Sequence, residues 1–186
     1  MAEHVCPWWM GYFLASPVRR LFEKPEIMLK PYIKEGMAVL EIGPGMGFFT
    51  IPMAKMTGQN GKVIVTDIQR QMLDNLKKRA QKAGVADRID CRLSTSGSLG
   101  IGDLDGSIDF AFAFAVVHEI PDKKDLFINI HRALKKDRLL FMADPKSHCP
   151  KQEFDTNVSL AKDLGFSAEP SAPAVRNSYC AVLRKI

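Results

Sequence analysis

Short runs of apolar residues alternate along this chain with segments whose apolar positions recur every three or four residues. Runs of β-branched and aromatic residues are typical of buried parallel strands, and the three-to-four spacing is typical of helices with one apolar face. The sequence therefore predicts strands at 37–42, 62–67, 89–93, 108–117 and 138–143, and helices at 48–55, 69–83 and 124–134. Strands that alternate with helices predict a parallel sheet of right-handed crossover units with helices on both faces.

The pattern changes after Asp144. A predicted helix at 152–164 is followed by a short strand within 166–175 and a last strand at 178–184. Only a proline-rich connection, 170–173, separates these two strands, so we expect them to pair antiparallel. The chain is thus predicted to be an α/β protein with a doubly wound, mostly parallel seven-stranded sheet, an antiparallel C-terminal strand and three layers, α/β/α.

The chain length indicates one domain. With 186 residues, of which 46% are hydrophobic and 25% charged, the chain can bury a sizeable core. We predict a single domain, 1–186, in which residues 1–36 form an N-terminal helical cap segment. The aromatic residues of this segment either dock onto the core as an anchor or cover a pocket; they are Trp8, Trp9, Tyr12 and Phe13.

The composition also limits location and partners. No apolar run approaches the roughly 18 residues that a membrane span needs, and the first residues do not resemble a signal peptide. We therefore expect a cytoplasmic protein with no membrane partner. The formal net charge of +5 comes from lysines and arginines spread among acids, so we do not expect a nucleic-acid partner. Nothing in the sequence indicates the oligomeric state.

The four cysteines include no CxxC pair, which indicates neither a disulfide framework nor a compact zinc site. Soft-metal ligand types occur elsewhere, but nothing in their spacing supports a metal site, and we predict none. These residues are His4, Cys6, His118, His148 and Cys149. An arsenic-methylating enzyme would need three converging cysteines, and the sequence leaves open whether three of the four converge.

Three glycines on alternate residues separate the first predicted strand from its helix. Gly43, Gly45 and Gly47 have no Cβ, so the backbone can take positive φ and a ligand can lie against the main chain. A strand-to-helix turn can use one or two glycines for structural reasons alone. Three glycines behind Glu41, an acid at the end of the strand, favour a loop that binds a nucleoside.

Asp67 ends the second predicted strand, one helix and one strand beyond the glycine loop. In a doubly wound sheet ligands bind at the carboxyl ends of the strands, where a carboxylate can accept hydrogen bonds from a ribose diol. The same residue could instead cap the helix that follows it. Taken together with the glycine loop, the ribose role is preferred.

Two nucleoside cofactors compete for such a site. A nicotinamide dinucleotide uses the spacing G-x-G-x-x-G so that backbone N–H groups hold its pyrophosphate, whereas the spacing here is G-x-G-x-G. Pro44 supplies no N–H, and a Glu41 carboxylate would repel a pyrophosphate. S-adenosylmethionine has an ammonium and a sulfonium but no phosphate, so its charges match this loop better and a nicotinamide oxidoreductase is disfavoured.

With these features the sequence resembles the class I S-adenosylmethionine-dependent methyltransferases over most of the chain, from about residue 37 to residue 143. The resemblance is carried by three segments: Glu41 to Gly47, Val65 to Ile68, and Phe110 to Asp122. It implies a Rossmann-like fold in which the glycine loop contacts the methionine portion, Asp67 holds the ribose hydroxyls and Ile68 lies on the adenine. The full set of cofactor-binding residues that it implies is Glu41, Gly43, Pro44, Gly45, Gly47, Asp67, Ile68, Ser94, Thr95, Ala113 and Phe114.

The sequence departs from the family pattern at two places. Many members have an aspartate after the third strand that reaches the adenine amino group, and this chain has Ser94-Thr95-Ser96 there. The usual Pro-Gly-Gly turn before the fifth strand is replaced by Lys-Lys-Asp-Arg at 135–138. The second change affects a structural turn, so cofactor binding need not suffer.

Methyl transfer requires alignment of the acceptor and sometimes a base that removes its proton. His118, next to Glu119 after the fourth predicted strand, is the candidate base; the alternative is a loop histidine that hydrogen-bonds its own neighbourhood. We therefore predict an S-adenosylmethionine-dependent methyltransferase that acts on a small-molecule acceptor. The alternative is a non-catalytic S-adenosylmethionine-binding or regulatory protein of the same fold.

Overall fold

The computed structural model describes residues 23–95 and 97–186. The described chain divides into two compact units, which are treated separately below: the first ends at Gly100 and the second begins at Ile101. The seven-stranded sheet has the strand order β3-β2-β1-β4-β5-β7-β6. Residues 1–22 of the predicted helical cap, with their aromatic anchor or cover, lie outside the described residues.

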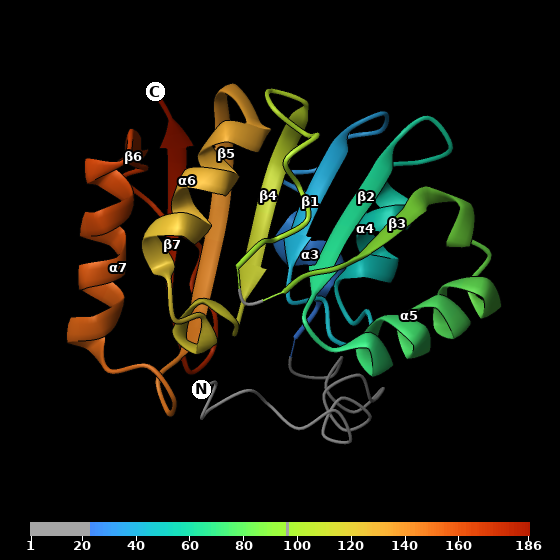
Figure 1. The fold of residues 1–186 in the computed structure, drawn as a ribbon, viewed down its shortest axis with the longest axis horizontal. Helices are drawn as coiled ribbons and strands as arrows, with labels where there is room; N and C mark the ends of the chain where they lie inside the picture. Colours follow the sequence, from blue (N-terminus) through green and yellow to red (C-terminus); the bar gives the residue numbers. More distant parts are fainter. Residues whose placement is uncertain (1–22, 96) are drawn as a thin grey trace. The chain divides into compact units, whose positions relative to one another are not determined.

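Three parallel strands form the sheet of the first unit (Figure 1). β1 (Ala38–Ile42) pairs with β2 (Lys62–Asp67), and β2 pairs with β3 (Ile89–Leu93). Because the strands are parallel, their carboxyl ends share one edge of this sheet, and the register sets Asp67 opposite Leu93 there. The residues that follow these strands in the chain therefore begin at the same edge of the sheet.

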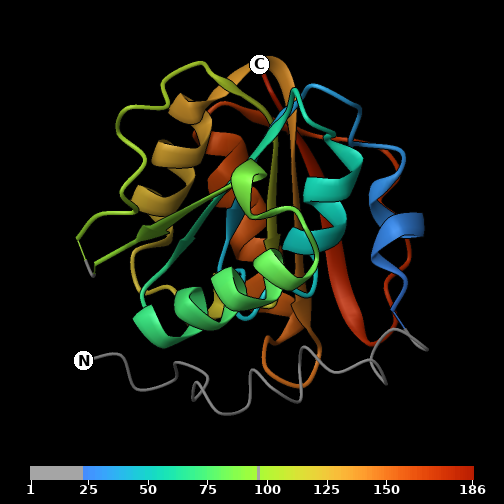
Figure 2. The same ribbon diagram turned by 90° about the vertical axis from the view of Figure 1, so that its right-hand side faces the viewer.

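Helices cover this small sheet. They are α3 (Pro25–Leu29), α4 (Thr50–Met56) and α5 (Arg70–Lys82), with a short 3-10 helix, η1 (Ala86–Arg88). Figure 2 shows α3 and α4 on the same side of β1 and β2. Pro52 falls in the first turn of α4, as predicted, where its missing N–H removes no helical hydrogen bond.

The apolar face of α5 packs this helix against the sheet. Its buried residues are Met72, Leu73, Leu76 and Ala80, which follow the three-to-four spacing read from the sequence. Burial of each large apolar side chain contributes about 1.5–3 kcal/mol. Gly84, with a φ of 66°, follows the end of the helix as predicted.

The second unit contains the other four strands. β4 (Ile108–Phe114) pairs parallel with β5 (Leu134–Pro145), and α6 (Lys123–Ala133) connects them. β7 (Ser178–Lys185) pairs antiparallel with β5, and β6 (Phe166–Ala168) pairs antiparallel with β7. The remaining elements are η2 (Val117–Glu119) and α7 (Lys151–Asp163). Figure 1 shows α6 in front of β5 and α7 beside β6 and β7.

Phenylalanine rings fill the core of the second unit. The ring of Phe112 lies 5.3 Å from that of Phe141 and 6.0 Å from that of Phe114, measured between centroids. Phe110, Phe112 and Phe141 are all buried. Strands that are covered on both faces need near-continuous apolar runs. The close packing of these rings holds the ends of β4 and β5 in place.

The predicted fold class is confirmed, with seven strands and antiparallel pairing at the C-terminal end. The predicted fourth strand is too long: it ends at Phe114 because Ala115 takes a φ of 56°, a left-handed conformation that breaks a strand. The predicted fifth strand is too short, since β5 begins at Leu134. The single domain over 1–186 stays a prediction. Within residues 23–95 and 97–186, no helix is long and apolar enough to cross a bilayer.

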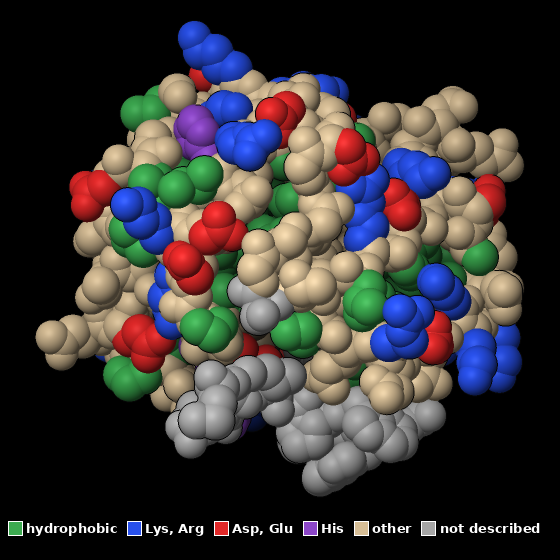
Figure 3. All heavy atoms as spheres, in the orientation of Figure 1, with side chains coloured by type: hydrophobic (Ala, Val, Ile, Leu, Met, Phe, Trp, Pro, Cys, Tyr) green, Lys and Arg blue, Asp and Glu red, His purple; other side chains and the backbone are tan. Residues whose placement is uncertain are grey.

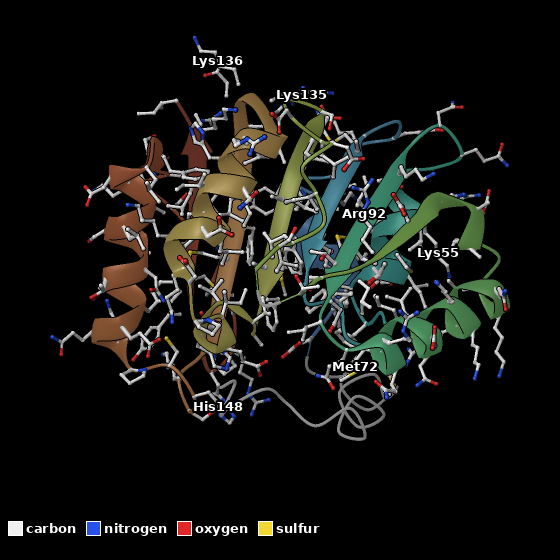
Figure 4. The ribbon with its side chains drawn as sticks, viewed as in Figure 1. Lys55, Met72, Arg92, Lys135, Lys136 and His148 are labelled. Carbon is white, nitrogen blue, oxygen red and sulfur yellow. The ribbon has the colours of Figure 1, made fainter. Side chains whose placement is uncertain are left out.

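Asp137 offers a test of the altered turn at 135–138, because its φ of 62° is a conformation that glycine adopts freely. We expect Asp137→Gly to raise the free energy of unfolding by up to about 1 kcal/mol. The matched control is Lys136→Gly next to it (Figure 4), whose φ is not positive and which should lose about 0.5–1 kcal/mol. Urea denaturation measures both, and equal destabilisation by the two glycines would contradict the role given to Asp137.

Candidate functional site

The glycine loop after β1 is shaped by three positive φ angles, 65° at Gly43, 54° at Gly45 and 84° at Gly47. Gly43 N donates to Thr66 O at 2.9 Å, which ties the loop to the end of β2. A Cβ at Gly45 would meet no atom within 4 Å, whereas one at Gly47 would lie 3.1 Å from Cγ of Leu76 in α5. Gly45 therefore leaves room for a ligand to approach the backbone, whereas a side chain at Gly47 would crowd Leu76 of α5.

Glu41 is buried at the end of β1. The hydroxyl of Thr50, the first residue of α4, donates from Oγ1 to Glu41 Oε2 at 2.5 Å. Burial raises the pKa of Glu41 to about 8; the Thr50 hydrogen bond lowers this pKa, and the charge of Asp67 raises it. A proton on Glu41 near pH 7 weakens the sequence argument that its carboxylate repels a pyrophosphate, whereas a nearby cation would favour the ionised form.

Asp67 is nearly buried at the end of β2. Its Oδ1 accepts a hydrogen bond from Gln69 N at 2.8 Å, while α5 begins at Arg70 with Gln69 as its N-cap, so Asp67 is not the helix cap. Burial raises the pKa of Asp67 to about 6, against the lowering effect of the backbone N–H groups of Gln69, Gly45 and Ile68. The carboxylate thus contacts the glycine loop and is mostly ionised above pH 6.

Two exposed apolar residues are neighbours of Asp67, Ile68 in the chain and Leu93 in the strand register. Ile68 is 46% exposed and Leu93, at the end of β3, is 41% exposed. Ser94 N donates to the Asp67 carbonyl oxygen at 3.0 Å, and Thr95 forms an isolated bridge within the loop that follows. An acceptor of hydrogen bonds therefore lies next to an apolar surface, a combination that suits a nucleoside.

The first unit brings together most of the predicted cofactor residues. At the carboxyl ends of β1, β2 and β3 and in the loops that follow them lie Glu41, Gly43, Pro44, Gly45, Gly47, Asp67, Ile68, Ser94 and Thr95. Ala113 and Phe114 belong to the second unit, at the end of β4, where Ala113 is fully buried and pairs with Met142. The cofactor contacts of all these residues stay predictions.

A second cluster surrounds His118 in η2 of the second unit. Its Nδ1 lies 2.8 Å from Oδ1 of Asp144, which is fully buried near the end of β5. Oε1 of Glu119 lies 4.0 Å from Nε2 of His118, too far for a hydrogen bond. The ring of His148 stacks on the ring of His118 with centroids 5.9 Å apart. Figure 4 shows His148 at the end of this unit opposite to Lys135 and Lys136.

The environment of His118 favours its protonated form. Burial lowers the pKa of His118, but the hydrogen bond and charge of Asp144 and the charges of Glu119 and Glu153 outweigh burial, and the net shift is upward from 6.5. Sequence reasoning identified His118 and Glu119, named His148 only as a soft-metal ligand type, and missed Asp144. One signal was available for Asp144, because it is an acid at the end of an apolar strand, as Glu41 is.

The described surface and thiols offer few other sites. In Figure 3, lysines and arginines lie singly or in small groups among acids on the face shown, and several are paired, as Arg132 is with Asp105 at 2.9 Å. Within the part of the chain that the structure describes, no three histidine, cysteine or acidic side chains are grouped so as to hold a metal ion. His4 and Cys6 lie outside that part.

Comparisons with known proteins agree on one family. A family model described as "Methyltransferase domain" matches residues 33–170. The arsenite methyltransferase of Halobacterium salinarum is 27% identical over 128 residues, which are 69% of this chain and 31% of that protein. The ubiquinone/menaquinone biosynthesis C-methyltransferase of Hahella chejuensis is 27% identical over 163 residues, 87% of this chain and 62% of that protein. The chain spans less than two thirds of the length of either relative.

The solved structures give the same picture for the fold. A SAM-dependent methyltransferase from Aquifex aeolicus matches with a TM-score of 0.85 and 23% sequence identity, covering 98% of this chain and 100% of that chain. At this identity the likeness shows the fold alone.

The raised pKa of Glu41 predicts how stability depends on pH. Between pH 4.5 and about 8 the unfolded chain has lost this proton and the folded chain retains it, so the group lowers the free energy of unfolding as pH rises. Gln is neutral at every pH. The free energy of unfolding of Glu41→Gln, relative to that of the unsubstituted protein, should therefore increase by about 1.4 kcal/mol per pH unit across that window. Urea denaturation at pH 5, 6.5 and 8 without ligand measures the difference, with exposed Glu35→Gln as control. Parallel stability curves for Glu41→Gln and the unsubstituted protein would contradict the assignment.

Proposed function

This chain belongs to the class I S-adenosylmethionine-dependent methyltransferases, and from that premise we propose that it transfers a methyl group from S-adenosylmethionine to a small-molecule acceptor. The observation that carries the proposal is the pairing of His118 with the buried Asp144, because a protein that only binds the cofactor has no need of an oriented base. The proposal keeps the cytoplasmic location expected from the sequence.

The residues of the first unit fit the chemistry of this cofactor. Asp67 presents a carboxylate that can accept hydrogen bonds from the two ribose hydroxyls, and the exposed side chain of Ile68 offers an apolar surface for the adenine. The open space at Gly45 allows the methionine portion to approach the backbone. A cation near Glu41, at the end of β1, would lower the pKa of this side chain and favour its ionised form.

When bound, the cofactor supplies a methyl group on a positively charged sulfur that is already an activated leaving group. The chain must therefore bind and orient the cofactor and the acceptor, and it need not activate the leaving group. In the second unit, His118 can take a proton at Nε2, because its Nδ1 is engaged by Asp144. Alignment by the loops and proton removal by His118 are the two tasks that we assign to this chain's own residues.

The acceptor is proposed to be a small organic molecule rather than arsenite. The arsenite methyltransferase relative is named for arsenite, but burial raises the pKa of Cys149 and of Cys180 to about 11, and burial also raises that of Cys91. The raised pKa values leave less thiolate at these three described cysteines, and no three metal-ligating side chains are grouped within the described residues. The thiol chemistry that arsenite would need is therefore weak in the described chain.

Loss of the Asp67 carboxylate tests the cofactor site. Asp67→Asn should weaken S-adenosylmethionine binding by about tenfold or more, because a charge-assisted hydrogen bond to the ribose is lost. Since the pKa of Asp67 is about 6, affinity for the unsubstituted protein should also fall as pH is lowered from 7.5 to 5.5. Isothermal calorimetry measures both, with exposed Asp74→Asn as the matched control. Unchanged affinity in Asp67→Asn would sink the ribose assignment.

Release of S-adenosylhomocysteine separates an enzyme from the non-catalytic alternative. We expect release when the protein is incubated with S-adenosylmethionine and a panel of small organic hydroxyl, thiol and amine compounds. His118→Gln should bind the cofactor with unchanged affinity and release product roughly a hundredfold more slowly, because the base is gone. Cofactor binding without any release across the panel would favour the binding protein.

A further inference from the structure

The side chain of Asp144 is unusual among the described acids. It is fully buried, its Oδ1 lies 2.8 Å from Nδ1 of His118, and its Oδ2 has no hydrogen-bond partner among the described residues. A buried carboxyl group in a purely structural pair normally has both oxygens satisfied, since a buried oxygen without a partner loses its hydration and gains no hydrogen bond in exchange. The arrangement is therefore expensive for the fold, which suggests a chemical role.

The position of Asp144 decides the state of the imidazole. An ionised carboxylate can only accept a hydrogen bond, so against an ionised Asp144 neutral His118 would carry its proton on Nδ1. Nε2 is then left with its lone pair and can act as a base. Glu119 Oε1, 4.0 Å from Nε2, is too far away to hold that atom in a hydrogen bond.

The backbone next to this pair is strained. Ala115, between β4 and η2, has a φ of 56°, and its N–H donates to Ala143 O at 2.7 Å. A left-handed conformation is unfavourable for a non-glycine residue, because its Cβ comes too close to the following carbonyl oxygen. Such strain is typical of functional sites. The left-handed conformation of Ala115 turns the chain at the end of β4, and the hydrogen bond of Ala115 holds this turn to β5. The segment that carries His118 follows directly.

The charges around the pair are mixed. The groups that act on His118 or stack on it are Asp144, Glu119, Glu153 and His148. Lys123 is paired with Glu153 at 3.3 Å, and Asp144 and Glu119 remain, so acids outnumber cations near the imidazole. This environment favours accepting a proton from a neutral acceptor.

We propose that Asp144 positions His118 as the general base and that the acceptor is therefore a protic group, the hydroxyl or thiol of a small organic molecule. This inference rests on the proposed function. The acceptor O–H or S–H loses its proton to Nε2 of His118, and the electron pair left on oxygen or sulfur forms the bond to the methyl carbon. The pair of the breaking bond between sulfonium sulfur and methyl stays on that sulfur, which becomes a neutral thioether, and the proton later leaves His118 for water.

The need for a base separates protic acceptors from acceptors with a free lone pair. A phenol, with a pKa near 10, and a thiol, with a pKa near 8.5, are largely protonated at pH 7 and gain nucleophilicity when the proton is removed. A thioether or a tertiary amine has no proton to lose and would gain nothing from an oriented imidazole. The Asp144–His118 pair is thus informative about the acceptor.

The first test observes His118 without any acceptor. In the full chain, ¹⁵N NMR should show neutral His118 with its proton on Nδ1 and a pKa above 6.5. In Asp144→Asn that pKa should move downward, and in the exposed control Asp163→Asn it should not. A proton on Nε2 of the neutral ring in the unsubstituted protein, which needs no variant to fold, would overturn the positioning role.

The second test uses catechol and dithiothreitol as protic probes and dimethyl sulfide as a lone-pair probe. We expect S-adenosylhomocysteine release with a protic probe, slowed roughly a hundredfold in Asp144→Asn and in His118→Gln. The rate should rise with pH through the His118 pKa, and in Asp144→Asn this limb should shift to lower pH. Transfer to dimethyl sulfide alone would overturn the acceptor assignment and leave the proposed function standing. Release with no probe, or absent S-adenosylmethionine binding by calorimetry on the same samples, would mean that the proposed function itself fails.

Discussion

Burial of a carboxylate at the end of an apolar strand is the constraint on which the chemistry of both units depends. Three acids lie at or next to the carboxyl ends of β1, β2 and β5, namely Glu41, Asp67 and Asp144, and each is 9% exposed or less. A buried charge without a partner is costly, so each acid either holds its proton, as Glu41 does near pH 7, or gains from a partner. The proposed partners are a cation, a ribose diol and an imidazole.

The fold could be predicted from the sequence because its signals are local. The β-branched run that forms β2 and the apolar stripe of α5 depend only on neighbouring residues, and both agree with the structure. Errors occur where a single backbone conformation decides the outcome. Ala115 turns the chain through a left-handed conformation that cannot be predicted from its residue type. β4 therefore ends before the apolar run of the sequence does.

The candidate site could be predicted only in part, for a related reason. The glycine loop and Asp67 can be recognised by residue type and spacing, so the candidate cofactor residues of the first unit could be predicted from the sequence. The contact between His118 and Asp144 joins η2 to the end of β5, and no periodicity reports such a long-range pairing. The protonation of Glu41 was also out of reach, because it follows from complete burial rather than from residue type.

The relatives named for arsenite and for ubiquinone/menaquinone biosynthesis differ widely in chemistry while sharing the methyltransferase domain. Fold and cofactor site therefore leave the acceptor open, and the acceptor must be argued from the side chains of this chain. The second unit supplies that argument through a buried acid, an oriented imidazole and a strained turn. These features are independent of the glycine loop, so each unit can be tested without the other.

The decisive measurement is a calorimetric titration of the full chain at pH 7.5 with S-adenosylmethionine and, separately, with NADH. We expect saturable binding of S-adenosylmethionine at one site per chain and no measurable heat of binding with NADH. Binding of NADH, or absence of S-adenosylmethionine binding by a folded protein, would contradict the assignment of the glycine loop, Glu41 and Asp67 to a phosphate-free, cationic cofactor.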